Sequence, residues 1–291
     1  MLAHLLDHGY VKFIETWGTG EMGQGLGTGG GRQGDCEVGI IEAARQSTGR
    51  GFNGWDTDQK LLRYLYENKH FTPFEMAGLI IEVQAPIMVF REWHRHRTQS
   101  YNEMSGRYTV LPDLYYHANP ENVWERAQGA FSATTKQMRA LDGVGPLTED
   151  DMIEWLAEDE DLSVRLEQHY QKGLKIGLPK EIARKKTPID HYSRMRACAN
   201  LRNWLAFMTL RCDPHAQWEI RQYANTVAEI IKIHFPLTHE LWSLAEHRQQ
   251  APVAWIRGHT WDTDAGKEYD EEVIAGPDRP QGEGWTPLYA R

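Results

Sequence analysis

The sequence predicts one α/β domain with helical insertions, and three observations support this fold class. Residues 79–85 (LIIEVQA) and 191–199 (HYSRMRACA) have the patterning of strands. Residues 216–235 carry apolar side chains at helical spacing and form the clearest amphipathic helix of the chain. The 291 residues show no internal repeat and no break in composition that would mark a linker between domains.

The N-terminal segment predicts a strand followed by an insertion. Residues 5–18 are typical of a short strand that enters a turn at Gly18. The glycine-rich residues 18–34 contain a GxGxxG pattern at Gly18, Gly20 and Gly23, which occurs in dinucleotide-binding turns. Because the glycines continue past the motif, no helix can open on it, and we interpret the segment as a flexible surface insertion.

Two helices are predicted between this insertion and the first central strand, over residues 36–47 and 56–70. Thr72 and Pro73 then have the residue types of a helix cap and a first turn.

After that strand, Pro86 is expected to open a helix that runs to Arg97. Arg91 and Arg95 would lie four residues apart on one face of it.

The second half of the chain is expected to be mostly helical. An acidic run at 147–174, within a helical region of about residues 120–180, favours a solvated helical hairpin. A short helix begins at Pro179 and ends before Pro188, and Asn200 is the expected cap of a helix over 201–211. Pro236 marks the end of the amphipathic helix.

The domain organisation follows from these elements. We expect residues 1–242 to form one catalytic α/β domain and residues 243–291 to form a C-terminal extension.

Composition excludes several classes of protein. The formal net charge of −9 and the pI near 5.8 argue against bulk nucleic-acid binding, although one small anion could occupy a local basic pocket. Three widely spaced cysteines predict neither a disulfide framework nor a zinc site. The first residues lack a secretory pattern, and no apolar run approaches the roughly 18 residues of a membrane span, so we expect a cytoplasmic protein without membrane contact.

Positive charge is concentrated at residues 95–108 (RHRTQSYNEMSGRY), among neutral hydrogen-bonding side chains. Arginine is the natural anchor for phosphate, because its planar fork makes paired hydrogen bonds. A lone arginine is usually a surface ion-pair partner, but that interpretation weakens where the neighbours are Asn, Ser, His and Gln. Segments 200–204 and 210–219 share this character, which points to an anion site built from separate segments.

Few side chains near these arginines are suited to proton transfer or nucleophilic attack. Ser105 has no nucleophile-elbow context, and the cysteines lack an activating motif. His96 and Glu103 could act as acid and base, but a histidine flanked by arginines has little reason to hold a proton. The spacing of His94 and His96 is not that of a metal site, so we predict none. A polyanion site with so few proton-transfer groups suits an enzyme whose cofactor performs the difficult chemistry.

Three ordered blocks of sequence carry a family resemblance. Residues 95–105 (RHRTQSYNEMS) resemble the signature of the flavin-dependent thymidylate synthases, Arg-His-Arg, seven residues, then Ser. Residues 70–75 (HFTPFE) and 200–221 (NLRNWLAFMTLRCDPHAQWEIR) are similar to two further segments of that family. Together the blocks cover most of residues 37–242, and their common order makes the resemblance specific.

The resemblance implies a fold, a reaction and an assembly. The fold would have a central, mostly antiparallel sheet flanked by helices, with active sites at subunit interfaces of a homotetramer. Reduced FAD would relay the methylene carbon of 5,10-methylenetetrahydrofolate to dUMP and supply the hydride, giving dTMP and tetrahydrofolate, with NADPH as the reductant. No cysteine nucleophile would be needed.

The resemblance also implies roles for individual residues. Arg107 would bind the phosphate of dUMP, Arg211 would bind the uracil ring, and Ser105 would hold the nucleotide without attacking it. The residues that would bind FAD are Ser47, Thr72, Arg95, His96, Arg97, Glu103, Asn200, Arg202 and His215. Those that would bind dUMP are Glu92, Glu103, Met104, Ser105, Gly106, Arg107, Arg184 and Arg211. The residues that would act in catalysis are Arg211, Ser105 and His70.

Two positions depart from the family pattern. Glu92 stands where many relatives carry Gln, and a carboxylate beside a nucleotide is unfavourable unless it is protonated or paired, for which Arg95 is the expected partner. Met76 replaces a frequent His. Two alternatives stay open: a related flavoprotein that acts on another nucleotide, and a single-stranded nucleic-acid-binding module.

Overall fold

The computed structural model describes residues 1–18, 35–130, 133, 136 and 138–245. Most of the glycine-rich insertion and all but the first residues of the C-terminal extension therefore lie outside the described residues.

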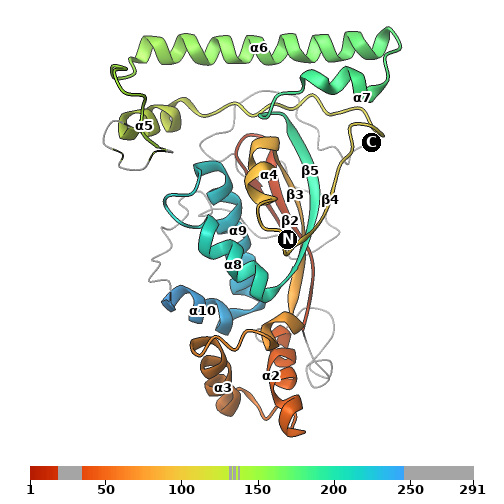
Figure 1. Ribbon diagram of the computed structural model, residues 1–291, viewed down its shortest axis with the longest axis vertical. Coiled ribbons are helices and arrows are strands. Elements are labelled where there is room, and N and C mark those ends of the chain that lie inside the picture. The colour runs from red at the N-terminus through yellow and green to blue at the C-terminus, as the bar shows by residue number, and fades with distance from the viewer. Residues whose placement is uncertain (19–34, 131–132, 134–135, 137, 246–291) are drawn as a thin grey trace.

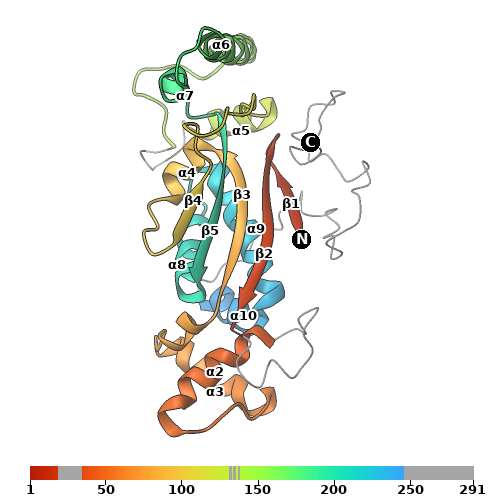
Figure 2. The same ribbon diagram turned by 90° about the vertical axis from the view of Figure 1, so that its right-hand side faces the viewer.

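A five-stranded antiparallel sheet forms the centre of the molecule. Its order is β1 (Leu2–Leu5), β2 (Gly9–Trp17), β3 (Gly78–Pro86), β5 (Tyr192–Asn200) and β4 (Ser100–Glu103). Figure 2 shows β3 and β5 side by side in its middle. They pair from Gly78 opposite Asn200 to Pro86 opposite Tyr192. The predicted antiparallel sheet and the α/β class of α+β type are confirmed.

Helices cover one face of the sheet and both of its ends (Figures 1 and 2). They are α2 (Val38–Arg45), α3 (Trp55–Glu67), α4 (Ile87–Trp93), α5 (Pro120–Ala130), α6 (Glu149–Lys175), α7 (Lys180–Ala183), α8 (Leu201–Arg211), α9 (Trp218–His234) and α10 (Pro236–Ala245). Short 3-10 turns lie at η2 (Asp35–Glu37), η3 (Gln46–Thr48), η4 (Pro73–Met76) and η5 (Arg184–Lys186). α8 and α9 pack against the sheet, α2 and α3 lie at one end, and α5, α6 and α7 lie at the other.

An aromatic core fixes α4 and α8 on the sheet. The rings of Trp93 and Phe207 contact each other at a tilt of 31°, with centroids 4.5 Å apart. Trp204 donates from its indole nitrogen to the carbonyl oxygen of Leu79 at 3.1 Å. Trp93, Trp204 and Phe207 are fully buried. Because interiors pack at crystal-like density, these rings hold the end of α4 against the middle of α8.

The cap predicted for α8 is present. The side chain of Asn200 accepts a hydrogen bond from the backbone nitrogen of Asn203 at 3.0 Å. Thr72 does not fulfil its predicted cap role, because its side chain makes no capping hydrogen bond and the turn that follows is a short 3-10 turn.

The predicted helix from Pro86 to Arg97 is too long, because α4 ends at Trp93. Beyond it the chain forms turns, in which the backbone nitrogen of His96 donates to the oxygen of Trp93 at 3.0 Å. The Tyr101 hydroxyl also donates to the oxygens of Trp93 and His96, at 3.3 and 2.7 Å. Arg95 therefore lies beyond the helix and does not share a helical face with Arg91.

Two other expectations are corrected. The N-terminal segment is a hairpin of two strands, in which Asp7 accepts hydrogen bonds from the backbone nitrogens of His8 and His117 at the turn. The acidic run is one 27-residue helix, α6, and not a hairpin. Thr148 caps it, and the acidic residues of its first turn favour its N-terminus.

Within the part of the chain that the structure describes, no helix combines the length and the apolar character needed to cross a bilayer.

Candidate active site

Arg211, the last residue of α8, is held by the end of α4 and the turn that follows. Its Nε donates to Nε2 of His96 at 2.9 Å, and its Nη1 donates to Oε2 of Glu92 at 2.6 Å. Its Nη2 donates to the backbone oxygen of Glu92 at 3.0 Å. A guanidinium has more N–H donors than these contacts use, and the Arg211 side chain keeps 15% of its surface exposed. The partner expected for Glu92 was wrong: Glu92 pairs with Arg211 and not with Arg95.

His96 is neutral in this arrangement. Burial lowers the pKa of His96 to about 4, with the charge of Arg211 acting in the same direction and Glu92 opposing them. An unprotonated Nε2 is also what the hydrogen bond from Arg211 requires. The sequence-based expectation that His96 holds no proton agrees with this direction, although burial and not the adjacent arginines is the main cause.

A second cluster joins the HFTPFE segment to the start of α8. Arg202 forms an ion pair with Glu75 of η4. The side chain of the next residue of α8, Asn203, donates to the carbonyl oxygen of Thr98 at 3.0 Å. Two of the blocks that carry the resemblance, 70–75 and 95–105, therefore meet at the N-terminus of α8.

A third cluster brings the loop after β4 against α7 and η5. Arg107 pairs with Glu181, with 3.1 Å between Nε and Oε2, and its backbone nitrogen donates to Oγ of Ser105 at 3.3 Å. A Cβ placed on Gly106 would lie 2.9 Å from Cδ2 of Leu111 and 3.1 Å from Cδ of Arg184, so Arg184 packs closely against the loop at this glycine. Four residues predicted to bind dUMP, Ser105, Gly106, Arg107 and Arg184, thus lie together.

Two neighbours of that loop are held by the central strand β5. Glu103 accepts from Oγ of Ser193 at 2.8 Å, and the backbone nitrogen of Met104 donates to the carbonyl oxygen of Arg194 at 2.7 Å. Both residues were predicted to bind dUMP, and Glu103 also FAD.

The guanidinium groups of Arg95 and Arg97 are exposed, and within the described ranges neither has a hydrogen-bond or ion-pair partner. In the sequence they flank His96 of the Arg211 cluster and precede Thr98, whose carbonyl oxygen accepts from Asn203 of α8. An anionic ligand is the natural partner for two such groups.

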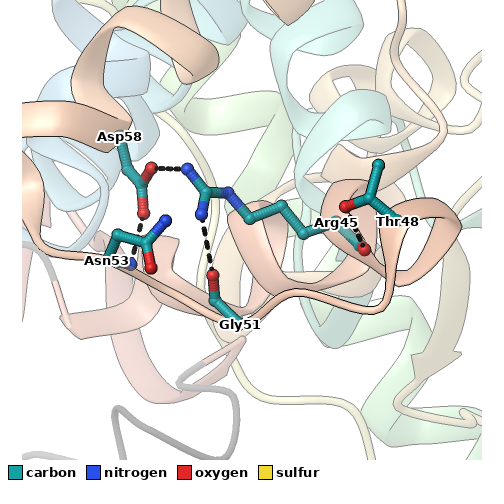
Figure 3. Close-up of polar contacts among 5 residues, drawn as sticks. All are labelled: Arg45, Thr48, Gly51, Asn53 and Asp58. Atoms are coloured by element: carbon teal, nitrogen blue, oxygen red, sulfur yellow. Dashed lines mark hydrogen bonds and ion pairs between the residues drawn. The ribbon is translucent and has the colours of Figure 1, made fainter.

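The loop that carries Ser47 is ordered by a network that sequence reasoning missed. Figure 3 shows Arg45 reaching across the loop, with Nη2 on the carboxylate of Asp58 and Nη1 on the carbonyl oxygen of Gly51 at 3.0 Å. The second oxygen of Asp58 accepts from the backbone nitrogen of Asn53 at 2.7 Å (Figure 3). The Asp58 side chain is 0% exposed and that of Arg45 is 13% exposed, so the pair is buried.

Ser47 itself lies on the exposed side of this loop. Its Oγ donates to the carbonyl oxygen of Ala44 at 3.1 Å, and Thr48 makes the equivalent bond to Arg45 at 3.0 Å. No sequence pattern near Arg45 or Asp58 predicted this pair, because an aspartate in the first turn of a helix is ordinarily exposed to solvent.

Three predicted residues stand apart from these clusters. His70 is exposed and makes an edge contact with Tyr64, with centroids 5.8 Å apart. Thr72 is exposed, and His215 pairs with Asp213 at 2.8 Å while its side chain is 71% exposed. A single chain therefore leaves them open at the surface.

Clustered arginines beside a neutral histidine and several hydroxyl groups are the side chains expected of an enzyme that binds phosphorylated ligands. The pattern of the thymidylate synthase complementing protein family matches residues 33–237. A flavin-dependent thymidylate synthase of Wolbachia pipientis wMel is 34% identical over 235 residues, which are 81% of this chain and 74% of that relative. The chain therefore belongs to the flavin-dependent thymidylate synthase family. It is an enzyme, a thymidylate synthase that depends on a flavin.

Other relatives agree with this placement. The flavin-dependent thymidylate synthase of Thermosipho africanus is 34% identical over 241 residues, covering 81% of this chain and 91% of the relative. Among solved structures, a UMP/dUMP methylase, PolB, from Streptomyces cacaoi bound with 5-Br dUMP has a TM-score of 0.64 at 25% identity, covering 83% of this chain and 97% of that one. The same methylase bound with 5-Br UMP has a TM-score of 0.62, covering 84% and 96%.

Proposed function

We propose that this enzyme converts dUMP to dTMP with 5,10-methylenetetrahydrofolate as the carbon donor, FAD as the flavin and NADPH as the reductant. The carbon is transferred as a methylene and reduced by a hydride, so dUMP, methylenetetrahydrofolate, NADPH and a proton give dTMP, tetrahydrofolate and NADP⁺. The observation that carries this proposal is the Arg211 cluster, in which a guanidinium has N–H donors beyond those that its contacts use, beside a neutral His96.

The residues present fit a flavin dinucleotide. Its pyrophosphate needs cationic donors, and Arg95 and Arg97 are exposed guanidinium groups without partners in the described ranges. Ser47, Thr72, Asn200, Arg202 and His215 would complete the flavin site in this proposal. When bound, the flavin supplies hydride transfer, which no side chain of the chain can provide.

Arg211 would bind the uracil ring. As C5 of the pyrimidine becomes nucleophilic, negative charge develops on the ring, and a fixed guanidinium stabilises that charge. Since His96 is neutral, it adds no second positive charge and orients Arg211 by accepting from Nε.

The phosphate of dUMP would lie at the third cluster, on Arg107 and Arg184, with Ser105 and the adjacent loop, Glu103 to Gly106, holding the sugar and phosphate. His70 completes the proposed set of catalytic residues.

The cysteines fit a mechanism without thiol attack. Burial raises the pKa of the Cys198 thiol, which disfavours the reactive thiolate. Cys36 is buried and Cys212 packs against the core.

We also propose a homotetramer with active sites at its subunit interfaces. The exposure of His70, Thr72 and His215 supports this, because a second chain could bring ligands and side chains to them. A cytoplasmic location fits water-soluble substrates of this kind.

A second candidate substrate is UMP. The solved structures of a similar enzyme are titled a UMP/dUMP methylase, with 5-Br UMP in one and 5-Br dUMP in the other. Nothing in the Arg211 cluster selects against a ribose hydroxyl, so both nucleotides belong in the assay.

The test is an anaerobic incubation of the purified, flavin-loaded protein with NADPH, followed by methylenetetrahydrofolate and either dUMP or UMP. The proposal expects NADPH to bleach the flavin absorbance and dTMP to form from dUMP. Flavin reduction with product from UMP alone would favour the second candidate, and no product from either nucleotide would reject the proposal.

A further inference from the structure

Glu92 occupies an electrostatically unfavourable position for stability. It lies in the last turn of α4, where helix carbonyls point outward and an anion is repelled. Its side chain is 42% exposed, so its ion pair with Arg211 contributes little to folding. The placement of a carboxylate here is therefore not explained by the fold.

Glu92 instead places a negative charge directly beside the guanidinium of Arg211. It contacts the guanidinium twice, through its carboxylate at 2.6 Å and its backbone oxygen at 3.0 Å, and the Arg211 side chain is only 15% exposed. The backbone contact does not depend on the side chain at position 92. The neutral His96 leaves Arg211 and Glu92 as the charges of the cluster, and they cancel.

We propose that Glu92 is a counter-charge that weakens the attraction of Arg211 for the nucleotide, so that the site binds its substrate less tightly than Arg211 alone would. This inference rests on the proposed function, because it takes dUMP as the ligand of Arg211. Glutamine at this position would keep an acceptor for Nη1 and the geometry of the pair while removing the negative charge.

The test measures the affinity of the flavin-loaded holoenzyme for dUMP by calorimetry, in the wild type and in Glu92→Gln. Removal of one charge at a partly exposed site should tighten binding by about three- to tenfold. The gain should shrink as ionic strength rises, since exposed charges are screened. A purely structural role of Glu92 would not produce this salt dependence.

Glu67→Gln is the matched control. Glu67 pairs with Arg63 on the exposed face of α3, so this variant makes the same charge change in an arginine–carboxylate pair outside the site. Its affinity for dUMP should stay within about twofold of the wild type, as expected for a remote screened charge. Glu92→Ala, which also removes the charge, replaces Glu92→Gln if that variant fails to fold.

The outcomes separate the two claims. Tighter binding by the Glu92 variant and not by the control supports the inference. Equal or weaker binding by the Glu92 variant, with normal binding by the wild type, overturns it. If the wild type itself does not bind dUMP, the proposed function fails, and the inference fails with it.

Discussion

Arg45 and Asp58 form a buried ion pair that joins the C-terminal end of α2 to the first turn of α3. Through Gly51 and Asn53 the same two side chains fix the loop between the helices (Figure 3). Gly49 and Gly54, both with positive φ angles of 64° and 96°, give the loop its turns. The loop that carries Ser47 is thus anchored on its buried side by the Arg45–Asp58 pair, while Ser47 itself is exposed.

Asp58→Asn should therefore destabilise the protein and weaken flavin retention. Loss of one partner leaves a buried, uncompensated guanidinium, which costs about 3 kcal/mol or more. Thermal unfolding and the ratio of flavin to protein absorbance measure the two effects. Asp56→Asn, in the same helical turn but exposed, should change neither. Equal behaviour of the two variants would show that the pair does not order the loop.

Arg211→Ala should abolish dTMP formation, with a fall in turnover of at least about 100-fold, because the group that stabilises the developing ring charge is lost. Flavin binding should weaken much less. Steady-state kinetics and flavin absorbance separate these effects, and Arg63→Ala on α3 is the control. Turnover equal to that of the wild type would reject the role of Arg211.

Ser105→Ala should retain measurable activity and bind dUMP more weakly. Its Oγ accepts from the backbone nitrogen of Arg107 at 3.3 Å and so shapes the loop without acting as a nucleophile. The KM for dUMP should rise more than turnover falls. Complete loss of turnover with unchanged nucleotide affinity would instead indicate a direct part in the chemistry.

Glu37 gives a prediction for pH. This buried carboxyl accepts from the backbone nitrogens of Leu237 and Thr238, and burial raises its pKa to about 7. Since the folded state holds the proton more tightly than the unfolded state, the stabilising contribution of Glu37 is present below its ordinary pKa and is lost as pH rises toward 7. Glu37→Gln lacks this titration.

The stability of Glu37→Gln relative to the wild type should therefore improve between about pH 5 and pH 8, by up to roughly 3 kcal/mol. Urea unfolding at several pH values measures this difference. A constant difference across that range would show that Glu37 does not titrate in the folded protein.

Deletion of residues 19–33 should leave dTMP formation largely unchanged, because their glycine-rich pattern predicts a surface insertion. Activity and thermal unfolding of the deletion variant are the measurements. A folded variant without activity would show that the insertion takes part in function.

Sequence patterns of a few residues predicted those strands, helices and caps whose formation depends on neighbouring residues. The strands β3 and β5, the Asn200 cap and the helix α9 follow from patterns within a few residues. The end of α4 was not predictable in this way, because the residues that follow it are also held by side chains distant in the sequence, such as Arg211, which donates to the Glu92 carbonyl from 119 positions away.

The site was predictable only in part for the same reason. Arginine-rich segments predicted an anion site, but the sequence alone could not pair Arg211 with Glu92, Arg202 with Glu75 or Arg107 with Glu181. Each pair joins segments far apart in the chain, and ion pairing depends on distances that only the folded chain defines. The roles of single residues came from the family resemblance.

The most direct test of the account is a crystal structure of the flavin-loaded enzyme with 5-bromo-dUMP, in which anomalous scattering locates the bromine. We expect the pyrimidine ring within hydrogen-bonding reach of Arg211 and the phosphate on Arg107 and Arg184. A nucleotide bound elsewhere, with Arg211 still closed on Glu92 and His96 and no contact to the ligand, would contradict it.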